Sequence, residues 1–149
     1  FLTYYNYGFS VWDNTAANLK LIHNLQKKAI QGLCHAAYDS HTKPLFHKFN
    51  IVQIPNHYSY KIALSYKSSF RQNENMYLSI SQLELRPANY PIRNAEIWIV
   101  PHSRTNYGNH MLKCTLPHLL NSFYELDIDI FSMSAKQICS LFVYWLLPC

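Results

Sequence analysis

The chain has 149 residues, a length that fits one compact domain or two small lobes that share a core. Hydrophobic residues make up 49% of the sequence and aromatic residues 15%, which argues against a disordered chain, and only three glycines argue against a turn-rich all-β design. The net charge of +5, with eight further histidines, favours an acidic partner such as nucleic acid.

The first predicted helix follows residues 13–15 (Asp-Asn-Thr), whose side-chain oxygens can cap a first turn, and it ends near Gly32. Its buried face is expected to consist of apolar residues that recur at helical spacing: Leu19, Ile22, Ala29 and Leu33. Its other side carries polar residues at three- and four-residue steps: Lys20, His23, Asn24, Lys27 and Gln31.

Two more helices are predicted before residue 71. One begins at Thr42-Lys-Pro44, because proline is tolerated in a first helical turn, and it runs through Phe49. After an extended or turn segment at residues 51–54, Pro55 restarts a helix. One face of this helix carries a stripe that fits a buried face better than a base-stacking surface: Tyr58, Ile62, Tyr66 and Phe70.

A polar cluster at residues 71–75 predicts a boundary between a lobe of residues 1–70 and a lobe of residues 71–149. In the second lobe, alternating patterns indicate short strands at residues 78–81 and 97–99, and residues 111–115 fit a further strand. Residues 102–110 are expected to form a loop, and residues 117–124 a short helix. The fold class is therefore mainly α, with a helical lobe followed by a small α+β lobe.

The most apolar run, residues 138–147, is about half of the roughly 20 residues that a membrane span needs. It predicts a core helix over residues 134–147 and no membrane partner. The inward residues of this helix are expected to be Ile138, Leu141, Phe142 and Trp145.

The four cysteines are widely spaced and include no C-x-x-C pair. We interpret them as reduced thiols of an intracellular protein of the cytoplasm or nucleus, with Cys34 and Cys139 buried, because disulfide frameworks are denser in shorter secreted chains. Neither the group around Cys34 nor the group around Cys114 has the paired ligand spacing of a structural zinc site. We therefore expect no metal or cofactor in this chain.

Four motifs follow one another along the chain: Leu25-Gln-Lys-Lys-Ala-Ile30, His41-Thr-Lys-Pro-Leu-Phe46, Pro101-His-Ser-Arg-Thr-Asn-Tyr-Gly108 and Leu116-Pro-x-x-Leu-Asn121. Their order and spacing resemble the region that follows the polymerase palm in reverse transcriptases of non-LTR retrotransposons of the jockey-like, arthropod kind. The last motif departs from the family, which has a preceding Gly, a Trp and a second Pro there. The resemblance implies that the first helix belongs to a polymerase thumb.

Such a polymerase holds two Mg²⁺ ions on paired carboxylates in a Tyr/Phe-x-Asp-Asp hairpin, and this motif is absent from the sequence. Asp127-Ile-Asp129 would place two carboxylates on one face of a strand, but their alternation with apolar residues is that of solvent-facing acids. The chain begins with Phe1, as expected of a fragment of a longer reading frame. We expect a fragment that is inactive alone, with Mg²⁺ belonging to the missing palm.

The nucleic-acid-binding residues are expected to be Lys20, Lys27 and Lys28 in the first helix, with Arg104 and Tyr107 in the later loop. Lys20 and Lys27 lie about two turns, or roughly 10 Å, apart along one side of a helix, which suits successive phosphates. The alternatives are a merely solvated helix face, and a loop in which Tyr107 packs inward.

The expected partners are an RNA/DNA hybrid or template–primer and the remainder of the polymerase chain. The competing interpretation of the whole chain is a non-enzymatic helical domain that binds protein through the aromatic stripe and the terminal helix.

Overall fold

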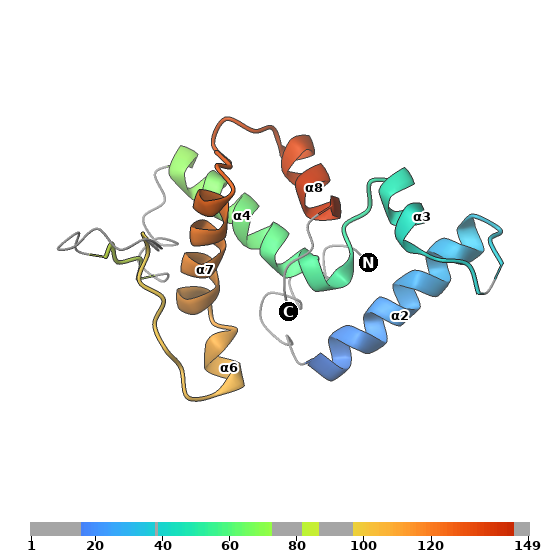
Figure 1. Cartoon of the computed structure of the whole chain (residues 1–149), viewed down its shortest axis with the longest axis horizontal. Coiled ribbons are helices and arrows are strands. Elements are labelled where there is room, and N and C mark those ends of the chain that lie inside the picture. Colours follow the sequence, from blue (N-terminus) through green and yellow to red (C-terminus); the bar gives the residue numbers. More distant parts are fainter. Residues whose placement is uncertain (1–15, 38, 73–81, 87–96, 145–149) are drawn as a thin grey trace. The chain divides into compact units, whose positions relative to one another are not determined.

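A computed structural model gives the structure of residues 16–37, 39–72, 82–86 and 97–144. These residues are mainly helical, as the sequence predicts (Figure 1). None of the described helices is both long and apolar enough to cross a membrane. The contacts of the chain group it into two units, Phe1–Tyr60 with Ala135–Cys149, and Lys61–Ser134.

The first unit contains α2 (Ala16–Leu33), α3 (Lys43–Lys48), the start of α4 (Ile54–Gln72) and α8 (Ala135–Tyr144). Helix α3 contacts both α2 and α8. The centre of this packing is apolar, with Phe46 1% exposed, Ile138 1% and Phe142 0%. Asn56 links α4 to α8, because its side-chain amide donates a hydrogen bond of 3.1 Å to the Phe142 carbonyl.

The local sequence explains where α3 begins and ends. Thr42 precedes the helix and Pro44 lies within its first two positions, where the missing N–H of proline removes no helical hydrogen bond. After Phe49, Asn50 adopts a φ of 51°, a left-handed conformation that asparagine tolerates better than most residues. The helix expected from Thr42-Lys-Pro44 is therefore confirmed.

The second unit contains the later turns of α4 with α6 (Asn106–Asn109) and α7 (Leu112–Glu125). Its buried side chains include Tyr66, Leu116 and Phe123. The Lys67 ammonium group donates hydrogen bonds to the backbone carbonyls of Ile130 and Met133. These bonds tie the segment after α7 to α4.

The strands expected in the second lobe differ from the structure. Met111 is the N-cap of α7 and residues 112–115 form its start, so the expected strand is wrong; the helix continues through Pro117, and the expected helix begins earlier. The burial of Leu116, Leu120 and Phe123 at helical spacing outweighs the one hydrogen bond that an internal proline removes. Residues 106–109, expected within a loop, form α6.

The expected strand at residues 97–99 makes an isolated antiparallel bridge between Leu85 and Trp98. The Arg86 N–H donates to the Ile97 carbonyl and the Ile99 N–H to the Glu84 carbonyl, each at 2.9 Å. The other expected strand, residues 78–81, lies outside the described residues. The α+β character of the second lobe accordingly stays a prediction.

The two units do not divide at the expected boundary, residue 70 or 71. Their division falls between Tyr60 and Lys61, inside the continuous helix α4. Because one unbroken helix serves both units, the grouping does not mark a linker between independently folding lobes. The expected lobes, 1–70 and 71–149, stay a prediction.

The expected core faces of α4 and α8 are confirmed where they are described. In α4, Ile62 and Tyr66 are each 5% exposed and Tyr58 is half-buried, and burial raises the pKa of Tyr66. In α8, Ile138 and Phe142 are buried and Leu141 is half-buried. The side chains of Phe70 and Trp145 lie outside the described ones.

The cysteines are arranged differently from the expectation. Cys34, Cys114 and Cys139 are free thiols. Cys114 is buried, whereas Cys34 and Cys139, which were expected in the core, are half-buried.

Candidate nucleic-acid interface

The orientation of α2 decides which of its lysines can meet a ligand. Gln26 fixes it, because its side-chain amide donates to the Val52 carbonyl and accepts from the Ile54 N–H, both at 3.0 Å. One turn away Ile30 is 4% exposed. The His23 ring stacks on the Phe46 ring of α3, with centroids 6.2 Å apart. This side of α2 therefore faces its own unit.

The buried face of α2 is rotated from the expected one. Leu19 and Ile22 are half-buried, but Ala29 and Leu33, which were expected in the core, are exposed. The physical reason is that Gln26 and His23, polar by composition, find partners inside the unit. The two exposed apolar residues instead share a surface with Leu21 and Leu25, which are 62% and 57% exposed.

Because the buried face of α2 differs from the expected one, the accessible lysines differ as well. Lys20 and Lys28 are exposed, and Asn24 between them is exposed as well, whereas Lys27 is half-buried. Residues four apart stand in line along a helix, so these three side chains form a row, which we call the basic ridge (Lys20, Asn24 and Lys28). The ridge is about 12 Å long at a rise of 1.5 Å per residue. Lys20 and Lys28 are therefore better placed to meet successive phosphates than the expected pair, Lys20 and Lys27.

His23 adds no charge to this surface near neutral pH. Burial lowers the pKa of His23 from its ordinary value of 6.5, the positive charge of Lys27 lowers it further, and a hydrogen bond with the Gln26 side chain opposes both effects. The neutral ring suits its stacked position on Phe46. The positive charge of α2 therefore comes from its lysines, and its sequence contains no Asp or Glu to offset them.

The second predicted surface, around Arg104, belongs to the other unit. Here Thr105 accepts a hydrogen bond of 3.1 Å from the Gly108 N–H through its side-chain oxygen, which caps the single turn of α6. A Cβ atom on Gly108 would lie 1.8 Å from the Ser103 Oγ. The turn therefore accounts for the presence of Thr105 and Gly108 in the Arg-Thr-x-x-Gly motif.

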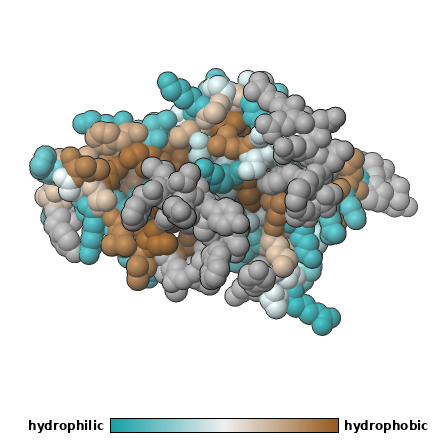
Figure 2. Space-filling view, turned by 180° about the vertical axis from the view of Figure 1, so that it is seen from behind, coloured by the Kyte–Doolittle hydropathy of each residue, from teal (hydrophilic) through white to brown (hydrophobic). Residues whose placement is uncertain are grey.

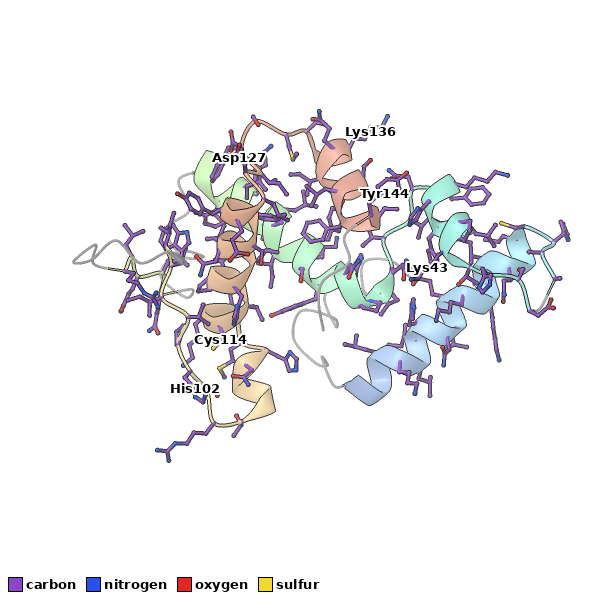
Figure 3. The ribbon with its side chains drawn as sticks, viewed as in Figure 1. Lys43, His102, Cys114, Asp127, Lys136 and Tyr144 are labelled. Carbon is purple, nitrogen blue, oxygen red and sulfur yellow. The ribbon has the colours of Figure 1, made fainter. Side chains whose placement is uncertain are left out.

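The turn is anchored to α7 and leaves Arg104 outside it. The Cys114 thiol, labelled on the first turn of α7 in Figure 3, donates to the Pro101 carbonyl at 3.3 Å. Arg104 is exposed, and among the described residues no hydrogen bond or ion pair engages its guanidinium group. Tyr107 lies within α6, and its side chain is outside the described ones, so neither interpretation of its ring is tested.

The two predicted surfaces lie in different units: Lys20, Lys27 and Lys28 belong to the first, and Arg104 and Tyr107 to the second. Each is a separate candidate contact. Sequence reasoning missed the exposed row of Leu21 and Leu25 beside the basic ridge. Its signal was present, because Leu21, Leu25, Ala29 and Leu33 repeat every four residues.

The acidic pair does not lie on a strand. Asp127, labelled just beyond α7 in Figure 3, has a φ of 53° and turns the chain, so the expected alternation is interrupted there. The Asp129 carboxylate accepts a hydrogen bond of 2.9 Å from the Phe131 N–H and closes a local turn. Both acids are exposed. Within the described residues, no group of three or more His, Cys, Asp or Glu is placed to hold a metal ion.

Comparison of this chain with family models, with curated proteins and with solved structures finds no match in any of the three.

Proposed function

We propose that this chain is a non-catalytic, thumb-like part of a retrotransposon RNA-directed DNA polymerase that binds RNA/DNA backbones without reading their sequence. The observation that carries the proposal is the exposed basic ridge on α2, a helix with three lysines and no carboxylate. The order of the four motifs supports the same parentage. In this proposal the α+β second lobe follows the thumb, and Mg²⁺ belongs to a palm elsewhere in the polymerase.

The physical basis is charge. A lysine that neutralises a phosphate releases a condensed counterion, which favours binding at low salt whatever the base sequence. Lys20 and Lys28 stand on one side of a helix whose opposite side is held by Gln26. The backbone of this helix is already ordered, so contact with a phosphate backbone requires ordering of the lysine side chains but no folding of the helix.

Arg104 provides a second contact in the proposal. Its neighbours Thr105 and Gly108 are engaged in the turn, while its own guanidinium group faces solvent. A guanidinium group can bind a phosphate with two parallel hydrogen bonds. The expected partners are an RNA/DNA hybrid or template–primer and the rest of the polymerase, in the cytoplasm or nucleus.

A charge reversal tests the basic ridge. The double variant Lys20→Glu/Lys28→Glu should bind a generic RNA–DNA hybrid more weakly, with a slope of log affinity against log salt reduced by about 0.9 for each lost phosphate contact. The matched control is Lys43→Glu/Lys136→Glu, which makes the same change in net charge at two exposed lysines of α3 and α8. Equal losses in the two variants would mean that only net charge matters, and the proposed ridge would be wrong.

The alternative function, a non-enzymatic helical protein-interaction domain, is favoured by a different observation, the exposed leucines of α2. Salt separates the two, because phosphate contacts weaken steeply as salt rises and apolar contacts do not.

A further inference from the structure

Beside the basic ridge, α2 carries a row of exposed apolar side chains, which we call the leucine ridge (Leu21, Leu25, Ala29 and Leu33). Leu21 is 62% exposed, Leu25 57% and Leu33 81%, and Ala29 between them is exposed too. Isolated exposed leucines are common on proteins, but four apolar residues at successive steps of four are one continuous feature. Figure 2 shows hydrophobic surface lying between hydrophilic patches on one face of the molecule.

The shape of the leucine ridge fits a helix. Side chains at steps of four form the ridges that pack into the grooves of a second helix, and this one extends over about 18 Å. The helix that carries the ridge is held in place, since Gln26 and Ile30 of α2 are engaged in the first unit. Leucine methyl groups offer nothing to a phosphate backbone, so nucleic acid is not the occupant of this row.

The charges beside the ridge indicate the chemistry of the partner. Each residue of the basic ridge precedes one of the leucine ridge: Lys20 precedes Leu21, Asn24 precedes Leu25, and Lys28 precedes Ala29. No carboxylate occurs between residues 16 and 33. A second copy of α2 would bring only lysines to these lysines, which is unfavourable, whereas a helix flanked by Glu or Asp would meet them with opposite charge.

We propose that the leucine ridge of α2 is a docking site for an amphipathic helix of another protein, whose apolar residues pack on the leucines and whose acidic residues meet Lys20 and Lys28. This inference does not depend on the proposed binding of nucleic acid. It does imply that the acidic helix and a phosphate backbone compete, because both use the lysines of the basic ridge.

The test uses the full chain and a labelled synthetic helical peptide of about three heptads with Leu at the apolar positions and Glu beside them. A second peptide has Lys in place of each Glu. The Glu peptide should bind the wild-type chain and the Lys peptide should not. Leu21→Gln/Leu25→Gln should weaken binding of the Glu peptide by at least about tenfold, because two buried leucines are lost while helix propensity is kept.

The matched control is Leu85→Gln/Leu126→Gln, which alters two leucines of similar exposure, 62% and 59%, outside α2. It should leave binding of the Glu peptide unchanged. The leucine-ridge variant should keep its affinity for the RNA–DNA hybrid, so failure of this inference is distinguishable from failure of the proposed function.

Five results would overturn the inference. The Glu peptide does not bind, the two peptides bind equally, or the two leucine variants lose affinity equally. In the fourth, wild-type chain forms dimers that Leu21→Gln/Leu25→Gln abolishes, which assigns the ridge to a second copy. Binding to vesicles of phosphatidylserine and phosphatidylcholine without binding to the Glu peptide likewise assigns it to a membrane surface.

Discussion

The side-chain amide of Asn121 binds the backbone of Trp98 through both its oxygen and its nitrogen. The Asn121 amide accepts a hydrogen bond from the Trp98 N–H at 2.9 Å and donates one to the Trp98 carbonyl at 3.0 Å. Asn121 is 5% exposed and lies in α7. A helix thus pairs with an extended segment much as a neighbouring strand would. Asn121, the last residue of the Leu-Pro-x-x-Leu-Asn motif, is explained by this structural role.

Removing this amide should destabilise the second unit. Asn121→Ala leaves the Trp98 N–H and carbonyl without these partners, and we expect a loss of about 2 kcal/mol in the free energy of unfolding, because unpaired half-buried polar groups cost about 1–3 kcal/mol. Urea unfolding followed by circular dichroism measures the change. The control is Ser122→Ala, whose hydroxyl donates to the His118 carbonyl at the surface and should cost less than about 0.5 kcal/mol. Equal effects of the two substitutions would show that the amide pairing is unimportant.

Substitution of Gly108 and of Gly32 by alanine should change the stability of the chain in opposite directions. Gly108→Ala should destabilise by about 1–3 kcal/mol, because the new methyl group would lie 1.8 Å from the Ser103 Oγ and 2.8 Å from its Cβ. Gly32→Ala should stabilise by about 0.5–1 kcal/mol, because nothing lies within 4 Å of a Cβ there and the residue belongs to α2. Thermal melting of the two variants checks both signs.

A second substitution identifies the cause at Gly108. If the contact with Ser103 is responsible, Ser103→Gly added to Gly108→Ala should recover part of the lost stability. No recovery in the double variant would point to a cause other than this contact.

His23 should make the stability of the first unit depend on pH. Burial lowers the pKa of His23 in the folded chain, so the unfolded chain binds its proton more readily. The stability that comes from the neutral ring is therefore complete above the ordinary pKa of 6.5 and is lost as the pH falls through that value. It levels off below the lowered pKa of the folded state.

The measurement is urea unfolding between pH 7.5 and about 5, a window set around the ordinary His pKa. His23→Gln cannot take up this proton and should show a shallower loss of stability on acidification than the wild-type chain. His41→Gln, at an exposed residue, is the control and should follow the wild type. Parallel curves for all three chains would contradict the assignment to His23.

The sequence predicts the start of α3 well, because Thr42 and Pro44 act through local backbone chemistry. It does not predict which face of α2 is buried. The helix has an apolar row on each of two sides, one with Ile30 and one with Leu25, and periodicity alone cannot choose between them. The choice depends on the bonds of Gln26 to residues 26 and 28 positions later, which no local pattern contains.

The loop before α7 is also only partly predictable from the sequence. The composition of residues 102–110 predicts an irregular segment, and Arg104 is accessible there. The single turn of α6 was missed because it depends on capping by Thr105 and on the close approach of Ser103 to Gly108. Side-chain contacts of this kind appear only when the chain is folded.

Arg104 is the residue of the candidate interface whose role is most sharply testable. It is exposed, and no carboxylate or other group of the described residues makes an ion pair or hydrogen bond with its guanidinium group. Arg104→Ala should therefore change the free energy of unfolding by less than about 0.5 kcal/mol. If Arg104 holds a phosphate, the same variant should bind an RNA–DNA hybrid more weakly, with a salt slope smaller by about 0.9.

Arg104→Lys separates charge from geometry at this position. A lysine keeps the counterion release, so the salt slope should return to the wild-type value, while the affinity stays lower because an ammonium group cannot make the two parallel bonds of a guanidinium group. Melting curves and hybrid titrations on the same three proteins decide the matter. A lower melting temperature for Arg104→Ala with unchanged hybrid affinity would assign Arg104 to the structure of the turn, and Lys20 and Lys28 would then be the remaining candidates for backbone contact.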